Sequence, residues 1–87
     1  MPQVRFEVMV EVSLRQGIAD PQGATIEKAL PALGFSSVSA VRAGKSFRFC
    51  IDAPDEAAAR QTALDISERL LANPVIEDSA VTLNQVP

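Results

Sequence analysis

The sequence "VRFEVMVEVSL", Val4–Leu14, decides the fold, because apolar and mostly polar side chains alternate along it. An alternation with a period of two predicts a β-strand with one buried face and one mostly polar face. A strand of this length would span roughly 36 Å, which is longer than most strands. We therefore expect it to extend beyond its own sheet, where the overhang could pair with another chain.

A helix is predicted to begin at Asp20, in the sequence "DPQG". Aspartate is a good N-cap, and Pro21 suits the first turn, where a missing N–H costs nothing. An apolar stripe follows with helical spacing and consists of Ile26, Ala29, Leu30 and Leu33. Gly34 is a plausible C-cap, whereas Pro31 would interrupt the helix. We expect a short, kinked or partly 3₁₀ helix here.

Two strands are predicted over residues 37–43 and 46–52, joined by a tight turn at "RAGK" in which Gly44 takes a positive φ. A second helix should follow Ala53-Pro54, since Asp55 and Glu56 suit the positive end of a helix dipole.

This second helix is expected to continue to about Ala72, because its apolar positions repeat with helical spacing. Asn73-Pro74 then ends it, since proline disfavours helical angles in the preceding residue. Val81 and Leu83 would share one face of a final strand.

The predicted order is therefore β-α-β-β-α-β in a single domain, residues 1–87. One-sided strands and helices indicate a ferredoxin-like α+β fold, an antiparallel sheet with both helices on one face. The first and third strands would be central. The second and fourth would form edges to which another subunit could add.

The composition excludes several functions. The chain has 8 basic and 11 acidic residues and a net charge of −3, which disfavours nucleic-acid binding. It has no Trp or Tyr and only 4 Phe, too few for an RNA-binding sheet. Without histidine and with 1 cysteine, it can form neither a Ser-His or Cys-His pair nor an ordinary zinc site.

The N-terminal sequence "MPQVRFEVMV" carries charges among its apolar residues, unlike a signal peptide or a membrane span. A single cysteine cannot form an intrachain disulfide. We therefore expect a soluble protein of the reducing cytoplasm that does not bind membranes.

Few residues suggest chemistry. Cys50 is a nucleophile by type, but a free cysteine is more often an inert small hydrophobe. With Met9 it would lie on the outward face of the sheet, which is either solvated or covered by another subunit. Glu7 and Glu11, roughly 13 Å apart on one strand, are too distant for paired carboxylate chemistry. The turn at "VRAGK" could hold a phosphate, but it lacks the glycine spacing of a phosphate loop and no helix follows it, so a hairpin turn with two solvated cations is the favoured interpretation.

Four segments together resemble the PurS family, the small S subunit of bacterial and archaeal phosphoribosylformylglycinamidine synthase. They are "GIADPQG" (17–23), "ALPALGF" (29–35), "VRAGK" (41–45) and "LLANPVIED" (70–78). The resemblance covers nearly the whole chain, and the combination of "DPQG" with "LANPVIED" is its most specific part.

The resemblance implies a subunit without catalytic residues, in a ligase of de novo purine synthesis. A glutaminase subunit (PurQ) releases ammonia with its own cysteine, and a synthetase subunit (PurL) activates the amide of formylglycinamide ribonucleotide with ATP and magnesium. The small subunit binds no cofactor or metal itself. As a homodimer or higher homo-oligomer it would bridge the other two and assist ammonia transfer.

Nine residues are the candidate partner contacts on this resemblance: Asp20, Gln22, Arg42, Gly44, Lys45, Asn73, Pro74, Glu77 and Asp78. The alternative function is a regulatory dimerisation domain of the same topology that senses a small molecule.

Overall fold

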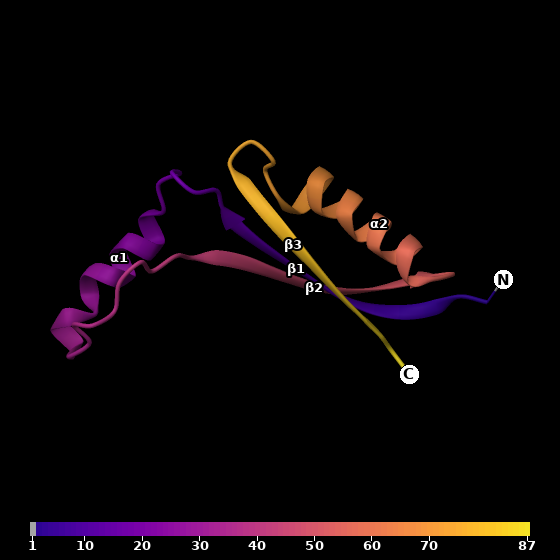
Figure 1. Cartoon of the computed structure of the whole chain (residues 1–87), viewed down its shortest axis with the longest axis horizontal. Helices are drawn as coiled ribbons and strands as arrows, with labels where there is room; N and C mark the ends of the chain where they lie inside the picture. Colours follow the sequence, from indigo (N-terminus) through magenta and orange to yellow (C-terminus); the bar gives the residue numbers. More distant parts are fainter. Residues whose placement is uncertain (1) are drawn as a thin grey trace.

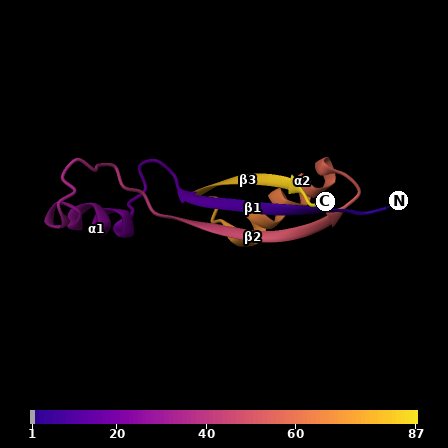
Figure 2. The same cartoon turned by 90° about the horizontal axis from the view of Figure 1, so that it is seen from below.

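The computed structural model describes residues 2–87 and is organised around β1, Val4–Leu14. This strand is the centre of an antiparallel sheet with the order β2-β1-β3, in which β2 is Gly44–Ala53 and β3 is Glu77–Gln85. Figure 1 labels the three strands, and Figure 2 shows them side by side, with β1 in indigo between its two partners. The alternation predicted for this strand is confirmed, since every second residue from Phe6 to Val12 is buried.

The core lies on one face of the sheet. Val8, Val10 and Val12 are at most 1% exposed. In the strand register Val8 stands opposite Phe49 on β2 and Leu83 on β3. Such cross-strand apolar pairs are the main stabilising unit of a sheet.

Helix α2, Glu56–Ile66, covers this face. Asp55 caps it by accepting a hydrogen bond from the Ala58 N–H at 2.8 Å. The side towards the sheet carries Ala59, Ala63 and Ser67, all fully buried, and these small side chains let the helix lie close to the strands. A π-helical turn, η2 (Ser67–Leu71), continues the helix, so its predicted end near residue 72 is confirmed.

Helix α1, Pro21–Ala29, is short, as predicted. The Asp20 carboxylate caps it at 2.9 Å from the Gly23 nitrogen. Pro31 begins a separate 3₁₀ turn, η1 (Pro31–Leu33). Gly34 ends that turn with a φ of 93°, and its N–H donates to the Pro31 carbonyl. The expected effect of this proline is therefore confirmed.

The strand predicted over residues 37–43 is absent, and the described residues form three strands instead of four. Ala40 has a φ of 57°, which interrupts an extended chain. The N–H groups of Val41 and Ala43 donate to the carboxylates of Glu27 and Asp20 instead of to a neighbouring strand. The hairpin predicted at "RAGK" is also wrong, because Gly44 is already part of β2 and pairs with Ser13.

As a consequence, β2 is an edge strand and not a central one. The two helices do not share a face either. Figures 1 and 2 show α1 beyond the end of the sheet, whereas α2 lies over it. We call residues 19–43 the α1 lobe. The prediction of an α+β fold with an antiparallel sheet is confirmed. The predicted fourth strand and the packing of both helices on one face of the sheet are wrong for the described residues.

The molecule is elongated, with extents of 58 × 30 × 14 Å. Its radius of gyration is 17.0 Å, whereas a compact chain of this length has about 12 Å. The difference arises from the α1 lobe, which extends the long axis past the sheet.

The close approach of α2 to the sheet gives a first prediction. Ala63→Leu should lower the free energy of unfolding by about 1–3 kcal/mol, because the added methylenes overfill a site with no free space. Ala57→Leu, on the exposed side of the same helix, is the matched control and should change it little. Urea denaturation at one fixed protein concentration measures both, and equal effects would contradict the packing described here.

Candidate functional site

The segments that carry the predicted partner contacts meet at one end of the sheet. Lys45 at the start of β2 lies 3.5 Å from Glu77 at the start of β3, measured from Nζ to Oε2. A hollow of about 380 Å³ opens beside this pair. Five of the nine predicted residues line it: Asp20, Gln22, Gly44, Lys45 and Glu77. Residues separated by more than fifty positions in sequence therefore form one surface region.

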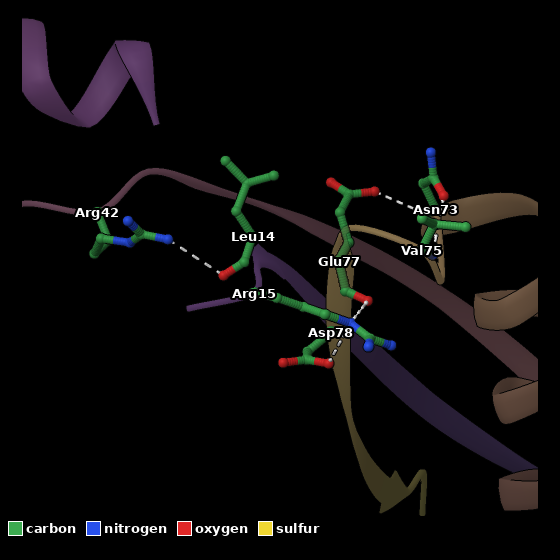
Figure 3. Close-up of polar contacts among 7 residues, drawn as sticks. All are labelled: Leu14, Arg15, Arg42, Asn73, Val75, Glu77 and Asp78. Atoms are coloured by element: carbon green, nitrogen blue, oxygen red, sulfur yellow. Dashed lines mark hydrogen bonds and ion pairs between the residues drawn. The ribbon is translucent and has the colours of Figure 1, made fainter. Parts of the chain in front are cut away.

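Glu77 has a structural role in this region. It stands opposite Leu14, on the face that carries α2, and its side chain is only 12% exposed. Its Oε1 accepts the Asn73 N–H at 2.7 Å, as Figure 3 shows. This hydrogen bond is the main reason that the pKa of Glu77 lies below its usual value, and the charge of Lys45 adds to the effect against the cost of burial. Glu77 thus closes the turn that precedes β3.

The rest of that turn is held by Asn73. Its side-chain oxygen accepts the Val75 N–H at 3.1 Å, and its carbonyl accepts the N–H groups of Ile76 and Glu77. Ala72 just before it is extended, so the helical run has ended where Asn73-Pro74 was predicted to end it. The prediction that the helix ends at Asn73-Pro74, before the final strand, is therefore confirmed.

Asp78 lies on the opposite face of β3, because successive residues of a strand point to opposite sides. It is 67% exposed and pairs with Arg15 at 3.3 Å. Arg15 also contacts the Glu77 carbonyl at 3.5 Å, and its own N–H donates to Ile76. Sequence reasoning missed Arg15, since only the register of β1 against β3 reveals the pair. An exposed ion pair of this kind contributes little to stability and leaves Asp78 available to a partner.

Asp20 does more than cap α1. Its second carboxylate oxygen accepts the Ala43 N–H at 2.7 Å, and Arg42 lies 4.0 Å away. The two backbone N–H groups, that of Ala43 first and that of Gly23 second, hold the pKa of Asp20 below its usual value despite the cost of burial. At 6% exposure this carboxylate ties the beginning of the α1 lobe to its end. The sequence predicted the cap, but it contained no signal for the bond to Ala43.

The same contact explains the glycine of "DPQG". A Cβ atom at Gly23 would lie 2.6 Å from the Val41 carbonyl oxygen and 2.6 Å from Asp20 Oδ2. Only glycine allows this approach of the helix to the returning chain. Arg42 fixes the lobe from outside, since its Nη2 donates to the Leu14 carbonyl at 3.4 Å.

The remaining predicted residues lie at the surface of this region. Gln22, Asn73 and Pro74 are exposed, and Pro74 borders a second hollow of about 450 Å³ next to Arg15 and Asp78. The exposed polar or charged side chains at the sheet end include Gln22, Arg42 and Asp78, which come from different segments and surround the more buried Asp20 and Glu77.

The outward face of the sheet has the composition that the alternation predicted. Cys50 is exposed there opposite Glu7, and Arg48 stands opposite Met9. Within residues 2–87, no group of three or more His, Cys, Asp or Glu side chains could hold a metal ion. No helix of this part of the chain is long and apolar enough to cross a membrane.

Comparison with known protein families gives one match over nearly the full length. The family model described as PurS, phosphoribosylformylglycinamidine (FGAM) synthase, matches residues 7–85. The PurS subunit of Mycobacterium leprae is 47% identical over 74 residues, which cover 85% of this chain and 90% of the relative. That of Synechocystis is 40% identical over 73 residues, covering 84% of this chain and 73% of the relative.

Solved structures agree. The purS subunit of Thermotoga maritima superposes with a TM-score of 0.88 at 30% identity, covering 97% of both chains. PurS of Methanocaldococcus jannaschii gives a TM-score of 0.84 at 30% identity, over 94% of this chain and 99% of that one. A chain in the structure of PurLQS from Thermotoga maritima gives 0.86 at 32% identity, over 97% of this chain and 100% of that one.

The lowered pKa of Glu77 gives a second prediction. A carboxyl group whose pKa is lowered in the folded state contributes stability that is fully present at pH values above its ordinary pKa. That stability is lost as the pH falls through the lowered pKa. Glu77→Gln should therefore reduce the loss in urea midpoint between pH 7 and pH 3. Glu11→Gln, exposed on the opposite face, is the control. If the urea midpoint of both variants falls as much as that of the wild-type chain between pH 7 and pH 3, Glu77 does not have this structural role.

Gly23→Ala gives a third prediction. The added methyl group collides with the Val41 carbonyl, so α1 and the returning chain must separate. Hydrogen exchange at the Val41 and Ala43 N–H groups should become roughly 5- to 150-fold faster, the equivalent of 1–3 kcal/mol, while the amides of β1 keep their rates. Ala24→Ser, at the exposed neighbouring position, should leave all these rates unchanged. Unchanged exchange in Gly23→Ala would show that the close approach does not constrain the lobe.

Proposed function

This chain belongs to the PurS family of phosphoribosylformylglycinamidine synthase subunits, and we propose that it is the non-catalytic small subunit of this ligase in purine biosynthesis. The observation that carries the proposal is the match over residues 7–85, together with a structural likeness that covers 97% of the chain. Its residues give an independent reason, because they include no histidine and no metal-binding group within the described part of the chain.

The partners follow from the complex described as PurLQS, which contains a chain of this fold. We propose a glutaminase subunit, PurQ, and a synthetase subunit, PurL. The synthetase would use ATP and magnesium to activate the amide oxygen of formylglycinamide ribonucleotide. Ammonia from glutamine would then displace the phosphate and give formylglycinamidine ribonucleotide. The chain described here would bind neither ATP nor magnesium.

Such a subunit would contribute by holding the active sites of the two larger subunits in place. Free ammonia is lost to solvent or protonated unless the two active sites are held in register, and a rigid domain between them supplies that register. Each strand of this chain is fixed to its neighbour along about ten residues, which gives the required rigidity.

We propose the sheet end around Gln22, Arg42 and Asp78 as the surface that contacts the larger subunits. These side chains are exposed and come from three segments that line neighbouring hollows at this end of the sheet. Charged rims of this kind steer association and set specificity. Asp20 and Glu77 would act indirectly by fixing the backbone beneath them.

Self-association completes the proposal. A radius of gyration well above that of a compact chain is unfavourable for an isolated domain of this size, and oligomerisation is a common remedy. A cytoplasmic location would follow from the pathway, from the single cysteine and from the absence of a helix, within residues 2–87, that could span a membrane.

Reconstitution tests the subunit role. Product formation from glutamine, ATP and formylglycinamide ribonucleotide by the two larger subunits should require this chain. Indifference to its presence would contradict the proposal and favour a separate sensing domain of similar topology.

The contact surface is tested by Asp78→Lys. We expect binding to the larger subunits to weaken about tenfold or more, since an opposite charge would then face the partner. The fold should persist, because the lost pair with Arg15 is exposed. Asp52→Lys is the matched control, because Asp52 forms a similar exposed pair with Arg5 at the other end of the same face. Equal effects of the two changes would show that this sheet end is not the contact surface.

A further inference from the structure

A hollow of about 600 Å³ lies within the α1 lobe, between α1 and the chain that returns to the sheet. We call it the lobe hollow. Ala24 and Lys28 line it from the helix, and Ala40 and Arg42 line it from the returning chain. Binding sites for small molecules commonly have volumes of about 300–1,000 Å³. The lobe hollow is therefore large enough for a small organic molecule.

Hydrogen bonds between its two walls hold the lobe hollow open. Asp20 accepts the Ala43 N–H at 2.7 Å, and Glu27 accepts the Val41 N–H at 2.8 Å. These two carboxylates fix the returning chain to α1 at two points along the helix. Ala24 lies between those points, and its small side chain leaves the space free. The lobe hollow is thus formed by the chain itself before any ligand binds.

The free hydrogen-bonding groups of the lobe hollow are donors. Asp20, Glu27, Lys28 and Arg42 are its charged side chains, and both carboxylates already accept backbone N–H groups. Lys28 takes part in none of the ion pairs found within residues 2–87. Arg42 is 48% exposed, lies 4.0 Å from Asp20 and uses one Nη atom on the Leu14 carbonyl, which leaves other guanidinium N–H groups free. Two cationic side chains are therefore available to an anion.

The lobe hollow lies away from the apolar stripe of α1. Ala24 and Lys28 are four residues apart and share one face of the helix. Ile26 belongs to the apolar stripe and is two residues from each of them, so its side chain points roughly 200° away around the helix axis. A surface that covers the stripe therefore leaves the lobe hollow accessible.

We propose that the lobe hollow binds a phosphomonoester, with Lys28 and Arg42 holding the phosphate. A phosphomonoester carries about 1.5 to 2 negative charges at pH 7, which match the two cations, whereas a single carboxylate would leave one of them unmatched. Inorganic phosphate alone would leave most of the volume empty. The apolar side chains of Ile18, Ala19 and Ala24 provide a wall against which the organic part of the ligand would lie.

The site connects to the proposed ligase through its substrate and through Arg42. A ribonucleotide substrate carries a phosphomonoester, so the molecule on which the larger subunits act has the chemistry that the lobe hollow would recognise. Arg42 also joins the lobe to the end of β1 through the Leu14 carbonyl, at the surface proposed to contact those subunits. A bound phosphate would therefore act on the attachment of the lobe to the sheet. This connection rests on the proposed function, whereas the binding itself does not.

Titration of the ¹⁵N-labelled chain with ribose 5-phosphate, at fixed ionic strength, tests the binding. We expect saturable shifts of the amide signals of Ala24, Lys28 and residues 40–42. The dissociation constant should be lower than for inorganic phosphate or glutamate, because only ribose 5-phosphate combines a dianion with an organic part. The absence of saturable shifts in the lobe would overturn the proposal. Equal or tighter binding of inorganic phosphate or of glutamate would overturn the assignment to phosphomonoesters.

Three variants locate the site. Lys28→Gln should raise the dissociation constant for ribose 5-phosphate about tenfold or more, because it removes a charge-assisted hydrogen bond. Arg60→Gln is the matched control and should leave it unchanged, since Arg60 is 45% exposed on α2 and pairs with Glu56 of its own helix. Ala24→Glu, at an exposed helical position, should abolish binding because it places a like charge beside the phosphate. Equal losses in Lys28→Gln and Arg60→Gln, or retained binding in Ala24→Glu, would overturn the site.

These measurements use this chain alone, so their failure is separate from a failure of the subunit role. Without binding, reconstitution of product formation still judges that role by itself. Binding together with a failed reconstitution would support the site and overturn its connection to the ligase.

Discussion

The burial of one face of β1 is the constraint on which the rest of the structure depends. Val8, Val10 and Val12 can be buried together only if the strand stays extended and in one register with both neighbours. That register directs Glu77 inward, towards Lys45 and the Asn73 turn, and Asp78 outward, towards Arg15. Two adjacent acidic residues thereby acquire different roles, one in fixing a turn and one at the surface. Their exposures of 12% and 67% follow from a period of two and not from any difference in chemistry.

Local signals predicted local structure well. The alternation of β1, the cap at Asp20 and the interruption at Pro31 each depend on a few neighbouring residues, and all three are present in the structure. The strand over residues 37–43 was predicted from local propensity too. It failed because tertiary hydrogen bonds from Glu27 and Asp20 capture its N–H groups. The glycine of "RAGK" looked like a turn residue, yet a Cβ atom there would lie 2.8 Å from the Val12 carbonyl, so close strand packing explains it.

The candidate site shows the same difference between what local sequence signals predict and what tertiary contacts decide. The sequence indicated which segments were of interest, and the structure brings five of the nine residues to one hollow. The sequence alone could not reveal the role of Arg15, because its pairing with Asp78 depends on the register of strands that are sixty residues apart. Nor could it separate residues that hold the backbone, such as Asp20, from those that face solvent, such as Arg42. That distinction depends on burial, and burial is a property of the assembled fold.

The central position of β1 also has a consequence for synthesis on the ribosome. The strand is made before either of its neighbours, and β3 follows β2 in the sequence, so the edge that pairs with β3 stays open longest. An open apolar strand invites pairing with the wrong chain. The charges of Arg5, Glu7 and Glu11 are spaced along its outward face and interrupt the apolar sequence. They can therefore act as gatekeepers that discourage aggregation of the nascent chain until β3 is complete.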